Sequence, residues 1–504
     1  MVDSLLALDQ TRPTMTARIN RRGFMKRAIG GGGVLILPSA KSAFTYQAND
    51  RINLAVIGHM YNAGHVFTSA HIYENVALVA LCDAEEQKIE ETFEAWRKRA
   101  KQGFDGNAPQ ERRAAEYYGR LVERKPRVFS DPRRMLAEMG SEIDSIVVSA
   151  FDHMHGAICG PAIRAGKHVF NERPVGLTIN DARSLRALAA EHKVATSIRN
   201  PGNASQQFRR AVELIRADAI GRIEEVHVWF PRGGPDHDEP PAKSRPVPDG
   251  LNWDAWLGPA AWRPYHPQWL AYAQWREFSN GGVGTFGPHA ANLAFMALRV
   301  GDLWKDDARA AGRTIRVEAK CNRINRLSFP KWEVVRWQVP ARGDLPPVAF
   351  TWHHGPPREL APGSRELIEG MLRERGASQE RVEALLKEAG TLIIGAKGAI
   401  ASDSHNTSFI MLPEEKFRGV EQKEPKTLKP SRGHYRDWLI TCRGGEPAWA
   451  SFDYAGPFSE FLMLGNVATQ FEGQLEYDPV AGKILNHAEA NKVLSYEYRE
   501  GWTL

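Results

Sequence analysis

Cysteine and long apolar runs are both scarce in this sequence. Its 504 residues include four widely spaced cysteines with no Cys-x-x-Cys pair, so we expect neither a structural zinc site nor a disulfide framework. The apolar stretch 28–38 contains four consecutive glycines and falls well short of the roughly 20 apolar residues that a membrane-spanning helix needs. No spanning helix is therefore expected. The cysteines are Cys82, Cys159, Cys321 and Cys442.

Net charge is also nearly absent once the N-terminus is set aside. The formal charge is +6, but residues 1–42 carry seven Lys and Arg against Asp3 and Asp9, a balance of +5 that leaves about +1 for the rest. A nucleic-acid-binding surface needs a clustered basic face, so the composition argues against a nucleic-acid partner. The remaining length exceeds one hydrophobic core, which predicts two domains.

The basic N-terminus contains a targeting motif. Residues 20–26 have the sequence NRRGFMK, typical of a twin-arginine export signal, and a short apolar stretch follows. Small residues favour cleavage after Ala40 or Ser42, so residues 1–42 are predicted to be the signal peptide. We expect export by the twin-arginine machinery to the periplasm or beyond, with a cofactor loaded before the folded chain is exported. An ordinary basic amphipathic N-terminus is the alternative.

The rest of the chain divides by the pattern of its apolar runs. Residues 43–178 alternate short runs with helix-compatible stretches, which predicts an α/β domain with a parallel, doubly wound sheet. Residues 179–504 change to strands separated by loops and charged helices, which predicts an α+β domain with a large, mainly antiparallel sheet. A charged stretch near 360–390 is expected to be a solvated helical insertion. Expected strands are 51–58, 76–82, 143–149, one that begins at 166–170, 223–230, 334–339, 348–352 and 392–394, and expected helices include 62–73, 154–165 and 206–216.

The first predicted strand ends in a glycine and the second in an acid, as in dinucleotide-binding domains. Gly58 would lie at the pyrophosphate, and Asp83 would bind the adenosine ribose hydroxyls. Because its carboxylate would repel the 2′-phosphate of NADP, Asp83 favours NAD. Met60 stands where a glycine normally lets the pyrophosphate approach, whereas Ala63 is acceptable at the third position. A tightly bound NAD is the expected cofactor.

Further motifs follow in order: DHMH at 152–155, GKHVFNERP at 166–174, WDAWLGP at 253–259, GGVGTFGPH at 281–289, and DYAGP at 453–457 with LGNV at 464–467. Together they resemble the Gfo/Idh/MocA family of nicotinamide-dependent oxidoreductases. The resemblance implies a Rossmann domain joined to an α+β domain whose sheet often forms an oligomer interface, so a homodimer or homotetramer is expected. It also implies a small carbohydrate or polyol substrate between the domains.

Where the family has a lysine, an aspartate and a histidine, this sequence has Arg173, Thr285 and His289. Alcohol oxidation needs a base for the hydroxyl proton, and a guanidinium stays protonated, so Arg173 can orient an oxygen but cannot be that base. His289 is the first candidate base, because its ordinary pKa lies near working pH. His155, after the turn that follows a strand, is the second. Tyr265, His266 and Thr285 are candidates to line the substrate pocket with His289.

Four more residues are assigned to the cofactor: Asp152, His153, Glu172 and Arg173. Glu172 and Arg173 are expected at the nicotinamide end. A metal site among the histidines and Asp152 is an alternative that the family motif makes unnecessary, so no metal is expected.

The resulting hypothesis is an exported, NAD-dependent oxidoreductase that transfers a hydride to or from a sugar, polyol or glycoside. Two alternatives stay open. The same site could catalyse NAD-assisted glycoside hydrolysis or elimination, or the departures at the three family positions could mark a non-catalytic carbohydrate-binding relative.

Overall fold

The computed structural model describes residues 51–58, 76–102, 109–305 and 312–504. The predicted signal peptide, the helix predicted at 62–73, Met60 and Ala63 lie outside these residues. Among the described helices, none combines the length and apolar character needed to cross a membrane.

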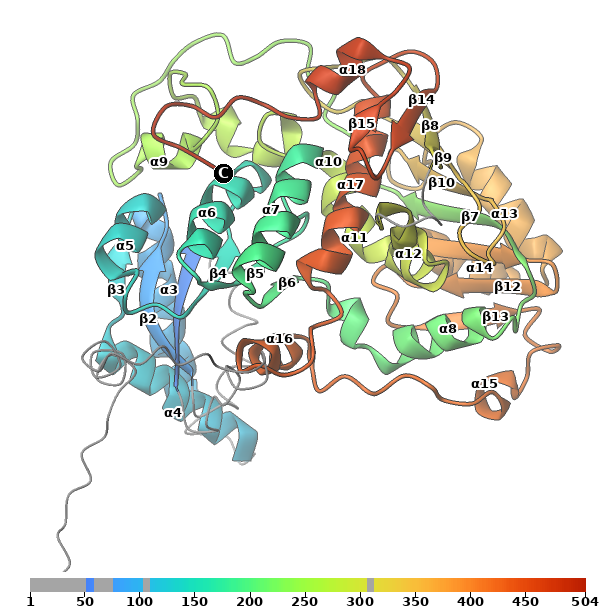
Figure 1. Cartoon of the computed structure of the whole chain (residues 1–504), viewed down its shortest axis with the longest axis horizontal. Coiled ribbons are helices and arrows are strands. Elements are labelled where there is room, and N and C mark those ends of the chain that lie inside the picture. The colour runs from blue at the N-terminus through green and yellow to red at the C-terminus, as the bar shows by residue number, and fades with distance from the viewer. Residues whose placement is uncertain (1–50, 59–75, 103–108, 306–311) are drawn as a thin grey trace, which may run out of the picture. The chain divides into compact units, whose positions relative to one another are not determined.

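Six described strands form a parallel sheet in the order β3-β2-β1-β4-β5-β6 (Figure 1). Successive strands are added on opposite sides of β1, so the strand order reverses between β1 and β4. In open α/β sheets ligands bind at the carboxyl ends of the strands at such a reversal. The strands are β1 (Ile52–Gly58), β2 (Val76–Cys82), β3 (Arg127–Phe129), β4 (Ser145–Ser149), β5 (His168–Asn171) and β6 (Thr196–Ile198).

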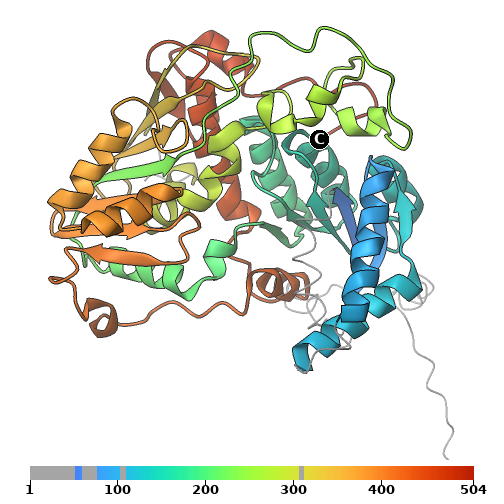
Figure 2. The same cartoon turned by 180° about the vertical axis from the view of Figure 1, so that it is seen from behind.

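Helices cover both faces of this sheet because alternate strand side chains point to opposite sides. Ala55 and Ile57 pack in one apolar cluster with α5, α6 and α7, whereas Leu54 and Val56 pack in another with α3, α4 and α16. Figure 2 shows α3 and α4 on the face turned away in Figure 1. The helices are α3 (Glu86–Gln102), α4 (Pro109–Arg124), α5 (Pro132–Met139), α6 (Asp152–Arg164), α7 (Ile179–His192) and α16 (His434–Cys442).

Nine described strands form the second sheet, in the order β13-β12-β11-β7-β10-β9-β8-β14-β15. Strands β7 and β10 pair in parallel, and the other neighbours pair antiparallel. The predicted fold class, a parallel α/β domain followed by an α+β domain with a mainly antiparallel sheet, is confirmed. The strands are β7 (Ile223–Phe230), β8 (Ile315–Cys321), β9 (Glu333–Val339), β10 (Val348–His354), β11 (Gly390–Gly395), β12 (Gly398–Ser402), β13 (Phe409–Leu412), β14 (Leu475–Asp478) and β15 (Lys483–Ile484).

The second sheet is also covered on both faces. One face packs against α8, α11, α12 and α17, and the other against α13 and α14. The charged stretch near 360–390 forms the two helices α13 and α14, and each buries an apolar side against the cluster that contains Trp229 and Leu392. The helices of this part are α8 (Gln206–Arg216), α9 (Trp253–Leu257), α10 (Gly281–Thr285), α11 (Gly287–Ala290), α12 (Asn292–Ala297), α13 (Ser364–Glu374), α14 (Gln379–Lys387), α15 (Val420–Lys423), α17 (Phe452–Ala468) and α18 (Ala488–Lys492).

A buried carboxylate joins the two parts of the fold. Glu460 on α17 pairs with Arg183 on α7 at 3.0 Å and accepts hydrogen bonds from the Trp304 indole at 2.8 Å and the Tyr477 hydroxyl at 2.7 Å. A buried charge needs such partners to offset its lost hydration. This network fixes α17, which packs on one face of the second sheet, against α7 of the first domain.

Candidate active site at the carboxyl edge of the parallel sheet

Gly58 ends β1 at the reversal point of the first sheet. It has φ +91°, and a Cβ placed there would lie 2.5 Å from the backbone nitrogen of Ala150, just beyond β4. Both the positive φ and this close approach require glycine. The predicted glycine therefore lets the chain turn where β1 and β4 meet.

Asp83 follows β2 and lines a cavity of ≈ 180 Å³ beside Gly58. Its Oδ1 accepts a hydrogen bond of 3.0 Å from the Glu85 amide, and burial raises the pKa of Asp83 to about 7. An acid in a mostly apolar cavity beside the strand reversal fits an adenosine group. The other lining residues are Ile57, Cys82, Ala84, Glu85, Lys88, Ser130, Pro132, Ser149, Ala150, Phe151, Met154, Ile158, Ala255 and Trp256.

Charged side chains gather beyond β5 and β6, on the other side of the reversal. The buried Glu172 carboxylate pairs with Arg173, and its second oxygen lies 3.6 Å from Nε of Arg199. The Arg173 Nε atom is buried and has no hydrogen-bond partner among the described residues. The two guanidiniums thus share one carboxylate, and the Nε of Arg173 remains as a donor for an oxygen-rich ligand.

His289 on α11 is buried beside this charged group. Burial, then the charges of Arg173 and the neighbouring His405, hold its pKa well below the ordinary value, so its imidazole is neutral. Its Nδ1 has no hydrogen-bond partner among the described residues. The His405 ring packs against it with centroids 4.7 Å apart. The ring is therefore neutral with an unused nitrogen, the form that accepts a proton, but its lowered pKa makes it a weaker base than the ordinary pKa behind the sequence prediction implied.

His153 and His155 lie at the start of α6, and their ring nitrogens contact backbone carbonyls. In His155, Nδ1 lies 2.8 Å from the Pro174 oxygen and Nε2 lies 3.1 Å from the Ala150 oxygen, and burial lowers its pKa to about 4. His153 Nε2 donates to the Trp256 oxygen at 3.0 Å. These contacts favour positioning roles for both histidines. Within the described residues no group of three or more His, Cys, Asp and Glu side chains could hold a metal ion.

Asp152 and Thr285 both form hydrogen bonds with backbone groups. Asp152 accepts a hydrogen bond of 2.9 Å from the Asn280 amide, directly before α10, and burial raises its pKa to about 6. The Thr285 hydroxyl donates to the Gly281 oxygen at 2.5 Å within α10. Asp152 therefore positions the segment that leads to His289, and the Thr285 proton is used inside its own helix.

Tyr265 and His266 lie in the loop that follows α9. Tyr265 is buried with its ring edge on Trp253, at a centroid distance of 5.1 Å, and His266 Nδ1 accepts from the Gln268 amide at 3.2 Å. Burial, then the negative charge of Glu85, raises the pKa of Tyr265. Tyr265 therefore packs in the aromatic cluster that contains Trp253 and Trp256.

Three functional candidates were missed from the sequence: Arg199, His405 and His434. Arg199 directly follows β6, so the rule that ligands bind at strand carboxyl ends could have found it. His434 begins α16 and accepts from the Asn200 amide at 3.0 Å, and burial followed by Arg199 lowers its pKa to about 3. His405 lies in the turn between β12 and β13. No local sequence signal connects either histidine with His289.

Two family models match the chain. The GFO_IDH_MocA model, described as an oxidoreductase family with an NAD-binding Rossmann fold, matches residues 52–199, and a model described as the C-terminal alpha/beta domain of that oxidoreductase family matches residues 238–324. The chain therefore belongs to the Gfo/Idh/MocA oxidoreductase family. The first sheet lies within the region that matches the NAD-binding Rossmann fold. The cavity at Asp83 and the cluster at His289 lie at the carboxyl edge of that sheet.

Curated relatives match a short part of the chain. An uncharacterised oxidoreductase of Schizosaccharomyces pombe is 29% identical over 105 residues, covering 21% of this chain and 28% of that protein. A 1,5-anhydro-D-fructose reductase of Ensifer adhaerens is 30% identical over 96 residues, covering 19% and 29%. The chain thus aligns with less than a third of either relative. Among solved structures, the WlbA dehydrogenase of Bordetella pertussis, in complex with NADH and UDP-GlcNAcA, is 14% identical with a TM-score of 0.48 over 84% of this chain and 98% of that one.

Proposed function

We propose that this protein is an exported, NAD-dependent oxidoreductase that acts on a sugar, polyol or glycoside by hydride transfer. The observation that carries the proposal is the neutral, buried His289 with its unused Nδ1 beside Arg173, at the carboxyl edge of a sheet of the NAD-binding family. The nicotinamide, when bound, supplies the hydride chemistry. His289 takes the hydroxyl proton, and Arg173 and Arg199 orient substrate oxygens.

A carbohydrate substrate is supported by chemistry and by one relative. Arginine donors suit hydroxyl and carboxylate oxygens, and the Ensifer adhaerens relative is named for a sugar derivative, 1,5-anhydro-D-fructose. Export is supported by the twin-arginine motif at residues 20–26, and the family resemblance supports a homodimer or homotetramer. Tight cofactor binding agrees with loading before export.

Native mass spectrometry of protein purified without added nucleotide tests the proposal, followed by denaturation to identify any released ligand. Released NAD or NADH, with new NADH fluorescence on addition of one member of a panel of aldoses, uronates, polyols and glycosides, is the expected result. Protein that contains no nucleotide and does not bind NAD or NADP at millimolar concentration would refute the redox function.

Asp83 predicts a preference for NAD that depends on pH. Because burial raises its pKa to about 7, the group is ionised above that pH and neutral below it, so repulsion of the NADP 2′-phosphate grows as the pH rises. We expect the ratio of NADPH to NADH dissociation constants to be about tenfold larger at pH 8.5 than at pH 5.5, measured by fluorescence titration. Asp83→Asn is the control, since the remaining pH dependence then belongs to the phosphate. An equal slope in both proteins would exclude Asp83.

The substitution Arg173→Lys distinguishes altered chemistry from a decayed site. If Arg173 orients the substrate and neutralises the charge of Glu172, replacing its planar guanidinium by a single ammonium group lowers kcat/KM about 10- to 100-fold. Thr285→Asp, made alone and in combination, restores the carboxylate that the family has at that position. A large gain of activity in the double variant would instead indicate a decayed site, and would contradict the assignment of Arg173 to the chemistry.

A further inference from the structure

Helix α9 forms part of the wall of the cavity that Asp83 lines. It belongs to the segment after β7, yet Ala255 and Trp256 line the same cavity as Asp83 and Pro132. Backbone bonds fix its approach: the Asn252 amide donates to the Ala84 oxygen at 2.8 Å, and the Glu86 amide donates to the Gly250 oxygen at 2.9 Å. A ligand in this cavity would therefore contact α9.

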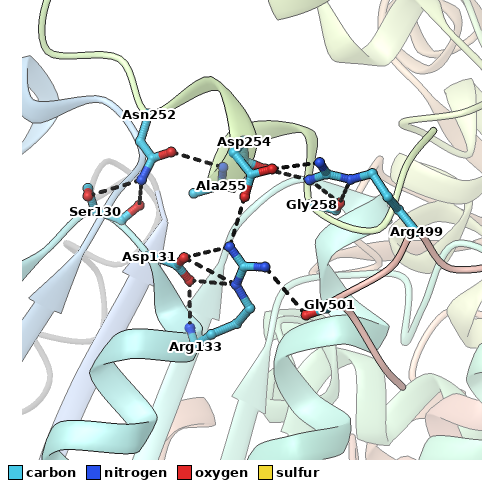
Figure 3. A network of polar contacts seen from close by, with 9 residues as sticks. All are labelled: Ser130, Asp131, Arg133, Asn252, Asp254, Ala255, Gly258, Arg499 and Gly501. Carbon is cyan, nitrogen blue, oxygen red and sulfur yellow. Dashed lines mark hydrogen bonds and ion pairs between the residues drawn. The ribbon is translucent and has the colours of Figure 1, made fainter. Parts of the chain in front are cut away.

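One carboxylate on α9 is bound by two arginines from distant parts of the chain (Figure 3). Asp254 Oδ2 lies 2.8 Å from Nη2 of Arg133, on α5, and Oδ1 lies 2.6 Å from Nη1 of Arg499, in the C-terminal tail. Burial would raise the pKa of Asp254, but hydrogen bonds from Arg499 and Arg133 outweigh it and lower the pKa. We refer to Arg133, Asp254 and Arg499 as the Asp254 clamp.

The ends of the clamp are themselves anchored. Arg133 is oriented by Asp131, whose Oδ2 lies 2.7 Å from its Nη2, and its guanidinium lies 4.1 Å from the centre of the Trp502 ring. Arg499 donates to the Gly258 oxygen at 2.9 Å and 3.1 Å, just after α9 ends. The buried Trp502 belongs to the apolar cluster of the first domain. The clamp thus ties α9 to the domain that holds the other cavity wall.

Trp256 supplies an independent observation at the same place. The residue lines the cavity and is 3% exposed, yet its indole Nε1 has no hydrogen-bond partner among the described residues. A buried N–H without a partner is costly and calls for one. The adenosine group in this cavity offers ring nitrogens and ribose oxygens as acceptors.

We propose that α9 is a latch on the dinucleotide: the Trp256 indole N–H hydrogen-bonds the adenosine half, and the Asp254 clamp limits how fast the cofactor leaves. The inference rests on the proposed function, because it takes NAD or NADH as the occupant of the cavity. It gives the C-terminal tail a role in retaining the cofactor. Arg133 and Arg499 act through α9 and are positioning residues.

Stopped-flow fluorescence tests the latch on the full-length protein. Protein loaded with NADH is mixed with excess NAD, and the loss of bound NADH fluorescence gives the dissociation rate. Asp254→Asn, which removes the charge and keeps the shape, is expected to accelerate release about tenfold, and Trp256→Phe by a similar factor. Arg133→Gln cuts one of the two ion pairs, so a smaller acceleration is expected. Asp254→Asn combined with Arg499→Gln should release NADH no faster than Asp254→Asn alone, since both act on one network.

Glu446→Gln is the matched control, because Glu446 forms an exposed ion pair with Lys429 and does not line the cavity. Its NADH release is expected to equal that of the wild type. Hydrogen exchange of residues 252–258, measured on the wild type with and without NADH, is expected to slow when NADH binds, and does not depend on any variant folding. Unchanged release from Asp254→Asn and Arg133→Gln, or unchanged exchange at 252–258, would overturn the latch. A wild type that binds no NADH refutes the proposed function instead.

Discussion

Replacement of His289 by glutamine is expected to lower kcat about 10²- to 10⁴-fold while NADH still binds, because the variant loses the group that takes the hydroxyl proton. Glutamine keeps much of the volume and can still hydrogen-bond, so the buried site beside Arg173 and His405 stays filled. Steady-state assay with the sugar identified by the NADH screen gives the rate, and fluorescence titration gives the NADH affinity.

His155→Gln is the comparison, since His155 is the other candidate base. Both of its ring nitrogens contact backbone carbonyls, at Pro174 and Ala150, so its loss is expected to lower the melting temperature and change kcat by less than tenfold. The reverse result, a large loss of kcat for His155→Gln and a small one for His289→Gln, would identify His155 as the base. Equal large losses with normal folding would mean that both take part.

The fold could be predicted from local sequence patterns, because each predicted strand could be identified without knowing which strands it pairs with. The runs at 223–230 and 206–216 match β7 and α8 in full. Short elements such as β3 and β15 were missed, since three or two residues give no periodicity. Near 360–390 the helical character was predicted but the packing was not: high charge hid the pairs Ile368 with Leu372 and Val382 with Leu386, whose i, i+4 spacing marks a buried helix side.

The site could be predicted where chemistry follows a strand end and could not where it depends on tertiary packing. Glu172 and Arg173 follow β5, and their pairing is local. His405 reaches His289 because the turn after β12 is fixed by Asn406, whose side chain accepts from the Leu293 amide at 3.0 Å. His434 lies on α16, which packs on the first sheet although it comes late in the chain. Contacts at such separations leave no spacing in the sequence to detect.

Gly58→Ala is expected to destabilise the fold by about 3 kcal/mol or more and to weaken NADH binding at least tenfold. Alanine at φ +91° costs about 1–2 kcal/mol, and its Cβ would lie 2.5 Å from the Ala150 nitrogen, so β1 and β4 must separate where the nucleotide binds. Urea unfolding gives the free energy of unfolding, and fluorescence titration gives the NADH affinity.

Gly166→Ala separates the two causes, because Gly166 also has a positive φ, +72°, but among the described residues, its chain neighbours aside, no atom lies within 4 Å of a Cβ built there. Its cost is expected to be the backbone term alone, about 1–2 kcal/mol, with NADH affinity unchanged. The difference between the two variants then measures the contact between β1 and β4. Equal losses of stability with equal NADH affinity would show that the close approach at Ala150 relaxes freely, and that the strand reversal does not depend on glycine for its shape.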